Sequence, residues 1–277
     1  RRSGFWLAAA LGLSAGLAVL ARPPVLFLIP VVLFYFWREK LWRRAILFFL
    51  VIFIVFIPWT YRNYKIYNQL MPFGAAGNFN FWIGNQHGGD GEQGLTEEQM
   101  QFLSSHEVRE INGESMRQFK VFLLNYPLEF IKLTFLRINK YFSVIRPMGF
   151  WFYQQGLGQL LFLLSSAAAS VFLFVFGLGG ILKAIAGRDK RLYYLLAFTV
   201  FTPLIIFITV VETRYRFQIY PLLAVFAGYF MMNLYSGQST WWKEKALRLA
   251  VILVFANGLL DLILSLDRFR ERLGWFF

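Results

Sequence analysis

The feature that most constrains the fold is a series of long apolar segments, each ending in a charged turn or in a turn rich in glycine and proline. Hydrophobic residues make up 58% of the 277-residue chain, and the mean hydropathy is +0.52. Such runs lack the alternating polar face that a soluble core of this size requires. The sequence therefore predicts an all-α fold, that of a polytopic helical membrane protein.

The apolar runs predict about seven transmembrane helices. The first run carries Gly12 and Gly16 in a GxxxG pattern, which is typical of helices that pack closely. The second run, residues 25–37, is shorter than the roughly 20 residues of a full span. Pro30 is expected to bend it. The expected spans are residues 4–21, 25–37, 45–59, 157–182, 192–211, 217–235 and 246–266.

Clusters of lysine and arginine indicate the orientation of these spans. Residues 38–44 and 183–191 are short basic loops, which the positive-inside rule assigns to the cytoplasm. The intervening segment is then expected on the outer side. The chain divides accordingly into an N-terminal membrane region (1–59), an extracytoplasmic loop (60–155) and a C-terminal membrane region with four helices (156–277).

The predicted outer loop carries two amphipathic helices. Thr96 and Gln99 have the spacing of a capping box, and apolar residues recur at helical spacing after it. Asn125-Tyr126-Pro127 interrupts the pattern. A second stripe runs from Leu128 to Ile145, with basic residues beside it, and is typical of a helix at the membrane interface.

Composition excludes several kinds of chemistry. The net charge of +13 fits positive-inside loops and contact with anionic lipid, because the basic residues lie in short loops rather than on one face. Nucleic acid is therefore not an expected partner. The chain has no cysteine and only two histidines, and it contains no phosphate-binding loop or dinucleotide fingerprint. No metal and no cofactor are expected.

Basic residues at two apolar helix ends are candidate phosphate ligands. Arg22 follows the first span, where an arginine at membrane depth needs a partner or a ligand. Glu212, Arg214 and Arg216 form a second cluster, and the arginine fork suits bidentate contact with phosphate. The alternatives are an arginine that reaches the lipid headgroups at the first place and a structural ion pair at the second.

Aromatic and amide side chains in the opening of the outer loop suit contact with a sugar, since ring faces meet C–H surfaces and amides meet hydroxyls. An aromatic belt at the interface and an ordered loop packed on the bundle are the alternatives. The two histidines are weaker candidates: His87 has only Asp90 nearby in sequence, and His106 is expected on a solvated helix face. The candidate sugar or acceptor ligands are Tyr61, Arg62, Asn63, Asn80, Trp82 and Asn85.

Four motifs, in this order, resemble those of bacterial GT-C glycosyltransferases of the protein-mannosyltransferase and aminoarabinose-transferase type. The resemblance extends over residues 4–235, and no single motif is diagnostic. The motifs are Ala21-Arg22-Pro23, then Pro58-Trp59-Thr60 with Tyr61-Arg62-Asn63-Tyr64, then Asn80-Phe81-Trp82-Ile83-Gly84-Asn85, then Arg214-Tyr215-Arg216-Phe217 leading to Tyr220-Pro221.

The resemblance implies transfer of a sugar from a polyprenyl-phosphate donor to a lipid, protein or glycan acceptor. The reaction would occur at the extracytoplasmic face of the bacterial inner membrane, with Arg22, Arg214 and Arg216 near the donor phosphate. In this family a pair of carboxylates in the first outer loop performs catalysis, and this chain has no such loop. We therefore expect the catalytic base on a segment upstream of Arg1, with this chain as the C-terminal part of the enzyme.

Two other functions fit parts of the sequence. A flippase or transporter for lipid-linked sugars would need a polar path, and few charges lie inside the predicted spans. A polysaccharide polymerase or ligase also uses outer arginines, and in this chain His87 or His106 would have to supply its base. A third possibility is a structural membrane subunit, in which substitution of these arginines would affect only the stability of the protein.

Overall fold

The computed structural model describes residues 2–72, 74, 77–92, 94–146, 157–236 and 244–266. Helices account for 82% of these residues, and none of them forms a β-strand, which confirms the all-α prediction. The chain forms two compact units. Unit 1 is Arg1–Leu133 with Val200–Val210, and unit 2 is Thr134–Thr199 with Val211–Phe277.

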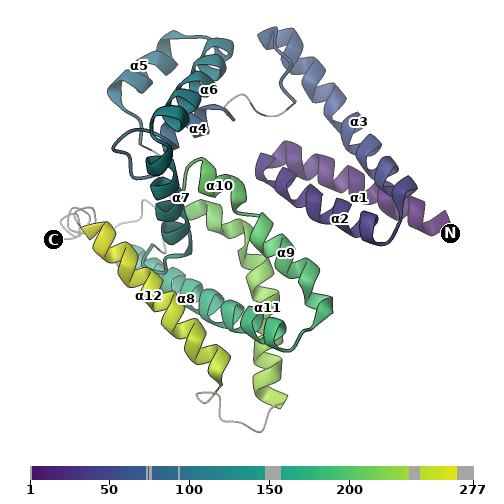
Figure 1. The fold of residues 1–277 in the computed structure, drawn as a ribbon, viewed down its shortest axis with the longest axis vertical. Coiled ribbons are helices and arrows are strands. Elements are labelled where there is room, and N and C mark those ends of the chain that lie inside the picture. Colours follow the sequence, from purple (N-terminus) through teal and green to yellow (C-terminus); the bar gives the residue numbers. More distant parts are fainter. Residues whose placement is uncertain are drawn as a thin grey trace. The chain divides into compact units, whose positions relative to one another are not determined.

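Fifteen helical elements are present in the described residues (Figure 1). In chain order they are α1 (Arg2–Ala21), the 3-10 helix η1 (Pro23–Leu28), α2 (Ile29–Arg38), α3 (Trp42–Tyr67), α4 (Phe79–Gly84), α5 (Glu97–Ser105), α6 (Val108–Asn125), α7 (Pro127–Phe142), α8 (Leu157–Ala186), η2 (Lys190–Leu192), α9 (Tyr193–Phe201), α10 (Leu204–Ile208), η3 (Thr213–Gln218), α11 (Tyr220–Ser236) and α12 (Lys245–Leu264).

The membrane-type part of unit 1 is built on close packing of α1 against α3. A Cβ atom at Gly12 would lie 2.7 Å from the carbonyl oxygen of Phe48, and one at Gly16 would lie 3.0 Å from Val55. The predicted GxxxG contact is thus present, with α3 as its partner. The two helices and the η1–α2 segment together bury a core around Val19.

Two helices predicted in the N-terminal membrane region differ from the structure. The run expected at 25–37 is split into η1 and α2, with the junction at Ile29 and Pro30. The span expected at 45–59 continues through Pro58 to Tyr67, because the polar residues after the proline still satisfy helical hydrogen bonds. It ends at Asn68, whose left-handed backbone (φ 50°) and N–H bond to the carbonyl of Tyr64 form a C-cap that asparagine tolerates well.

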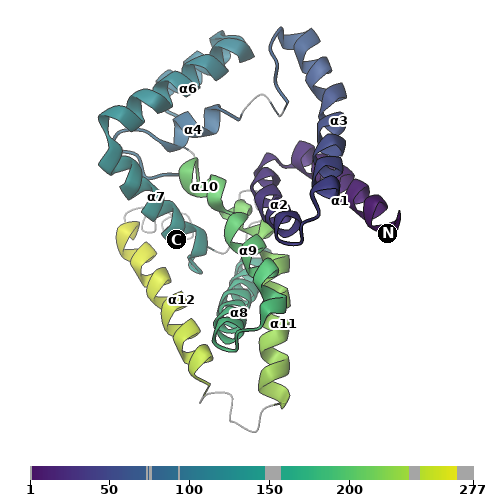
Figure 2. The same cartoon turned by 45° about the vertical axis from the view of Figure 1, so that its right-hand side comes forward.

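The structure contains the amphipathic helices predicted for the outer loop: α5 and α6 belong to unit 1, and α7 is divided between the units after Leu133. The capping box is present, with Gln99 N–H bonded to Thr96 Oγ1 at 3.2 Å. The predicted break falls between α6 and α7, where Pro127 is the first residue of the new helix. Helix α4 packs beside α6, as both views of the ribbon show (Figure 2).

Unit 2 is a helical bundle in which α8 packs against both α11 and α12. The first contact depends on glycine: a Cβ atom at Gly180 would collide with the carbonyl group of Phe226, so only glycine permits this approach. At the far end of α8, Nζ of Lys183 lies 3.0 Å from a carboxylate oxygen of Glu244, the residue that precedes α12.

Five helical segments in the described part of the chain are long and apolar enough to cross a membrane, as in a multi-pass membrane protein. They are Gly4–Ala21, Trp42–Tyr67, Leu161–Ala186, Lys190–Ile208 and Lys245–Leu264. The two other predicted spans correspond to the shorter apolar segment Pro23–Arg38 and to α11, which has 17 residues. The count of seven and the three topological segments stay predictions.

Candidate functional site

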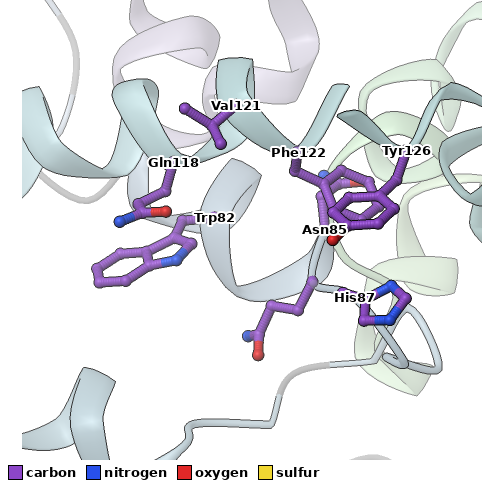
Figure 3. A pocket seen from close by; sticks show the side chains of 8 residues that line it. Trp82, Asn85, His87, Gln118, Val121, Phe122 and Tyr126 are labelled. Atoms are coloured by element: carbon purple, nitrogen blue, oxygen red, sulfur yellow. The ribbon is translucent and has the colours of Figure 1, made fainter. Parts of the chain in front are cut away.

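A small cavity in unit 1 gathers aromatic, amide and imidazole side chains. Its volume is about 210 Å³, and it lies between α4, the segment after α4, and α6. Figure 3 shows the ring of Trp82 at one end of the opening and the ring of His87 at the other. The lining residues are Trp82, Asn85, Gln86, His87, Gln118, Val121, Phe122 and Tyr126.

The floor of the cavity is fixed by the C-terminal end of α4. The side-chain amide of Asn85 is 1% exposed and donates to the carbonyl oxygens of Phe81 (2.8 Å) and Ile208 (3.1 Å). Gly84 lies against the backbone of Thr209, where a Cβ atom would collide with the carbonyl oxygen. A distant segment of the chain, α10 and the residue after it, therefore holds α4 in place.

The aromatic wall at Trp82 is held by edge-on ring contacts. The indole meets Phe79 at 6.1 Å and Phe102 at 5.7 Å between centroids, with the ring planes at 87° and 79°. These T-shaped contacts are a preferred geometry of aromatic pairs. Gln86 is held in the same region by bonds from its amide to the carbonyl oxygen of Ile83 (2.9 Å) and to Oε1 of Gln99 (3.1 Å).

At the other end of the cavity, His87 pairs with a carboxylate from α7. Nδ1 of His87 lies 2.7 Å from Oε2 of Glu129, and the N–H of Gly88 donates to Oε1 at 2.7 Å. The imidazole also stacks on Tyr126, with 4.5 Å between centroids and 23° between planes. One face and one nitrogen of the imidazole are thus fixed, while 70% of the His87 side chain is exposed.

Glu129 is held in its charged form. Burial alone would raise its pKa, but the hydrogen bonds from the Gly88 N–H and from His87, together with the charges of His87 and Lys132, hold the pKa of Glu129 below its ordinary value. An ionised carboxylate only accepts hydrogen bonds, so the proton shared with the imidazole resides on Nδ1. In the neutral form of the imidazole, Nε2 of His87 then carries the lone pair.

The predicted sugar ligands do not all meet at this cavity: Trp82 and Asn85 line it, and the others do not. Tyr61 (62% exposed) and Arg62 lie on the last turns of α3, where the guanidinium of Arg62 sits 5.0 Å from the ring of Trp59. Asn63 is buried and donates to the carbonyl oxygen of Met71 at 2.8 Å.

Asn80 lies half-buried on α4 outside the lining, and Arg22 is exposed at the residue that precedes η1. The buried amides of Asn63 and Asn85 hold backbone segments in position. The asparagines that were predicted as sugar ligands therefore also have structural roles: Asn63 and Asn85 bind backbone carbonyl groups, and only Asn85 of the two lines the cavity.

The predicted acid–base cluster in unit 2 separates into two environments. Arg216 is fully buried on η3 and donates to the backbone carbonyl oxygens of Ser143 and Arg146. Burial lowers the pKa of Arg216 from its ordinary value. The guanidinium bridges backbone groups within the fold, and this geometry gives it a structural role rather than that of an exposed phosphate ligand.

Arg214 and Glu212 form an ion pair nearer the surface, with 25% and 14% of their side chains exposed. Burial alone would lower the pKa of Arg214, but the charge of Glu212 and the contacts with Tyr215 raise it, so the guanidinium stays charged. The Glu212 carboxylate orients the fork of Arg214, and such an ion pair is the alternative to a phosphate site that was expected from the sequence.

Sequence reasoning ranked His87 low because its partner is remote. Glu129 is 42 residues away, and Gln118 and Tyr126, which complete the cavity, lie on or just after another helix. No spacing rule joins residues on separate elements. In the part of the chain that the structure describes, no group of three or more His, Cys, Asp or Glu could hold a metal ion.

No protein-family model, curated protein or solved structure matches this chain.

Proposed function

We propose that this protein is the C-terminal part of a membrane glycosyltransferase that moves a sugar from a polyprenyl-phosphate donor to an acceptor at the extracytoplasmic face of a bacterial inner membrane. The observation that carries the proposal is the cavity of unit 1, in which aromatic rings, amides and an imidazole–carboxylate pair surround one small volume. The apolar helices of the chain would keep that cavity beside the lipid that carries the donor.

The chemistry of the lining suits a sugar ring. Trp82 and Tyr126 present aromatic rings, Gln86 offers its amide oxygen as an acceptor, and Gln118 offers its amide oxygen and one N–H. Pockets for larger organic ligands usually measure about 300–1,000 Å³, whereas this cavity measures about 210 Å³. The small volume favours a single sugar unit over a nucleotide.

Two arginines remain the proposed ligands of the donor phosphate. Arg22 is exposed, and Arg214 is partly exposed and oriented by Glu212. The planar fork of arginine makes paired hydrogen bonds to phosphate oxygens that lysine cannot reproduce. Tyr61, Arg62 and Asn80 remain proposed acceptor contacts.

The experiment is a transfer assay on the native full-length polypeptide in detergent or in vesicles, with tritium-labelled mannose or aminoarabinose on undecaprenyl phosphate as donor. We expect Trp82→Ala and Arg214→Ala to abolish transfer to a membrane extract while membrane insertion stays intact. The matched controls are Trp42→Ala, at the first residue of α3, and Arg117→Ala, an exposed arginine that also pairs with a neighbouring glutamate. Full activity of both test variants would contradict the proposal.

One rival is favoured by a specific observation. A polysaccharide polymerase or ligase needs a base within the outer segment, and the His87–Glu129 pair is such a group. The products distinguish the two functions, because a polymerase or ligase moves a glycan chain, whereas the proposed enzyme moves one sugar. Mass analysis of the labelled product with each donor therefore decides between them.

A further inference from the structure

We infer that His87 is a catalytic base of this site, that it removes the proton of the acceptor hydroxyl, and that Glu129 positions it. The inference rests on the proposed transfer reaction and names the group that performs one of its steps. The expectation from family resemblance places the base on a segment before Arg1. The described residues contain a candidate base, the imidazole of His87.

The imidazole of His87 is held at one nitrogen and on one face. Nδ1 is bound to Oε2 of Glu129 at 2.7 Å, and the second oxygen of that carboxylate is bound to the N–H of Gly88. Tyr126 stacks on the ring face at 4.5 Å. A carboxylate that orients an imidazole at one nitrogen, and leaves the other nitrogen to exchange a proton, is the arrangement of a general base and its orienting group.

His87 is also located where an acceptor could be bound. His87 lines the cavity together with the aromatic and amide groups that would hold a sugar, so a hydroxyl bound there lies within reach of the imidazole. The side chain is 70% exposed, which lets an acceptor approach and lets the captured proton leave to water. Figure 3 shows the imidazole at the edge of the opening, beside Tyr126.

In the proposed step one proton and one sugar are transferred. Nε2 of His87 takes the proton of the acceptor hydroxyl as that oxygen bonds to the anomeric carbon of the donor sugar. The bond between the anomeric carbon and the phosphate oxygen breaks, and its electron pair leaves with polyprenyl phosphate. The negative carboxylate of Glu129 stabilises the imidazolium, which then releases its proton to water.

The other histidine lacks these features and is a matched control. His106 is the C-cap of α5, its Nδ1 contacts the carbonyl oxygen of Phe102 and the hydroxyl of Ser105, and its ring stacks on Phe102 at 3.9 Å. It contacts no carboxylate among these partners and does not line the cavity. A glutamate control is Glu98, an exposed residue in the first turn of α5 that does not line the cavity.

The test measures donor binding and transfer separately in the native full-length polypeptide. The donor is undecaprenyl phosphate carrying tritium-labelled mannose or aminoarabinose, whichever the wild type uses. The variants are His87→Ala, His87→Gln, Glu129→Gln, His106→Ala and Glu98→Gln. The amide of His87→Gln can still donate to Glu129 but cannot take up a proton, so this variant keeps the test valid if His87→Ala fails to fold.

We expect both His87 variants to lower kcat by about 100- to 10,000-fold with donor binding retained. Glu129→Gln should lower kcat less and move the acid limb of the pH–rate profile to lower pH, because the charge that stabilises the imidazolium is removed. The charged groups near this site are Glu129 and Lys132, and Tyr126 covers the ring. The two control variants should keep the wild-type rate and profile.

Each failure has its own signature. Transfer by His87→Gln at the wild-type rate and with the wild-type pH profile would overturn the inference and leave the proposed function standing, with the base on another segment. Loss of donor binding together with transfer would also overturn it, since His87 would then be a binding residue. A wild-type protein that neither binds nor uses either donor would overturn the proposed function and this inference with it.

Discussion

Arg146 and Asp261 form a bidentate ion pair, with Nε of the arginine 2.5 Å from Oδ2 and Nη2 2.8 Å from Oδ1 of the aspartate. The two residues are 115 positions apart, and Asp261 is fully buried on an apolar helix. The same arginine donates to the hydroxyl of Ser265 at 2.8 Å. The pair therefore fastens the segment after α7 to α12 with charged groups that water does not reach.

Asp261→Asn should destabilise the protein strongly. Removal of one partner of a buried ion pair leaves the other charge uncompensated, at a cost of about 3–5 kcal/mol. The measurement is the thermal midpoint of the detergent-solubilised protein followed by circular dichroism. Glu114→Gln, which breaks the exposed pair with Arg117, is the control and should change the midpoint little. Equal midpoints for the two variants would argue against a buried pair.

Arg216→Lys should destabilise the protein although it keeps the positive charge. A lysine cannot bridge the two carbonyl oxygens of Ser143 and Arg146 with a planar fork. Loss of hydrogen bonds from a charged group at a buried site costs about 2 kcal/mol or more. Arg214→Lys, at a partly exposed position, should cost less stability. Chemical unfolding of both variants checks the order, and the reverse order would contradict it.

Gly84→Ala and Gly113→Ala should have opposite effects. A methyl group at Gly84 would meet the backbone of Thr209, so α4 or α10 must shift, at a cost of about 1–3 kcal/mol. Gly113 is exposed within α6 with open space at its Cβ position, and alanine there should stabilise the helix by about 0.5–1 kcal/mol. The thermal midpoints of the two variants provide the comparison, and a destabilised Gly113→Ala would refute it.

The contact of Glu129 with His87 and Gly88 should make stability depend on pH at the acid end. Because the folded-state pKa of Glu129 lies below its ordinary value of 4.5, its contribution is present above that value and is lost as pH falls through the folded pKa. Wild type should therefore be more stable than Glu129→Gln at neutral pH and equal to it in acid. Thermal midpoints across this range test the sign, and a difference that grows in acid would refute it.

Patterns within one helix were predictable from sequence. The capping box at Thr96, the break before Pro127 and the close approach at Gly12 each depend on spacing along a single element, and the structure contains all three. Helix α3 shows the limit of this reasoning. The span was expected to end at residue 59, but the helix continues to Tyr67, because a proline removes only one hydrogen bond and the following residues supply the rest.

The partners in contacts between elements were not predictable. His87 pairs with a residue 42 positions away, and Arg146 pairs with one 115 positions away, so no local pattern announces either pair. Trp82 and Asn85, which belong to one predicted sugar-binding motif, line the cavity. Asn63, which belongs to another such motif, binds the backbone carbonyl of Met71 instead. Residue type predicted the chemistry that these segments offer, and packing decided which side chains are accessible.

The bond from Asn85 to the carbonyl oxygen of Ile208 spans 123 positions and has a consequence for biosynthesis. A chain that emerges from the ribosome at about 5–20 residues per second makes its cavity-lining segment roughly 6–25 s before the residue that secures it. During this interval α4 has no α10 to pack against, although its aromatic side chains can already meet Phe102 of α5 and Phe119 of α6. Completion of the cavity therefore waits for α10, a short helix that is synthesised well after α4.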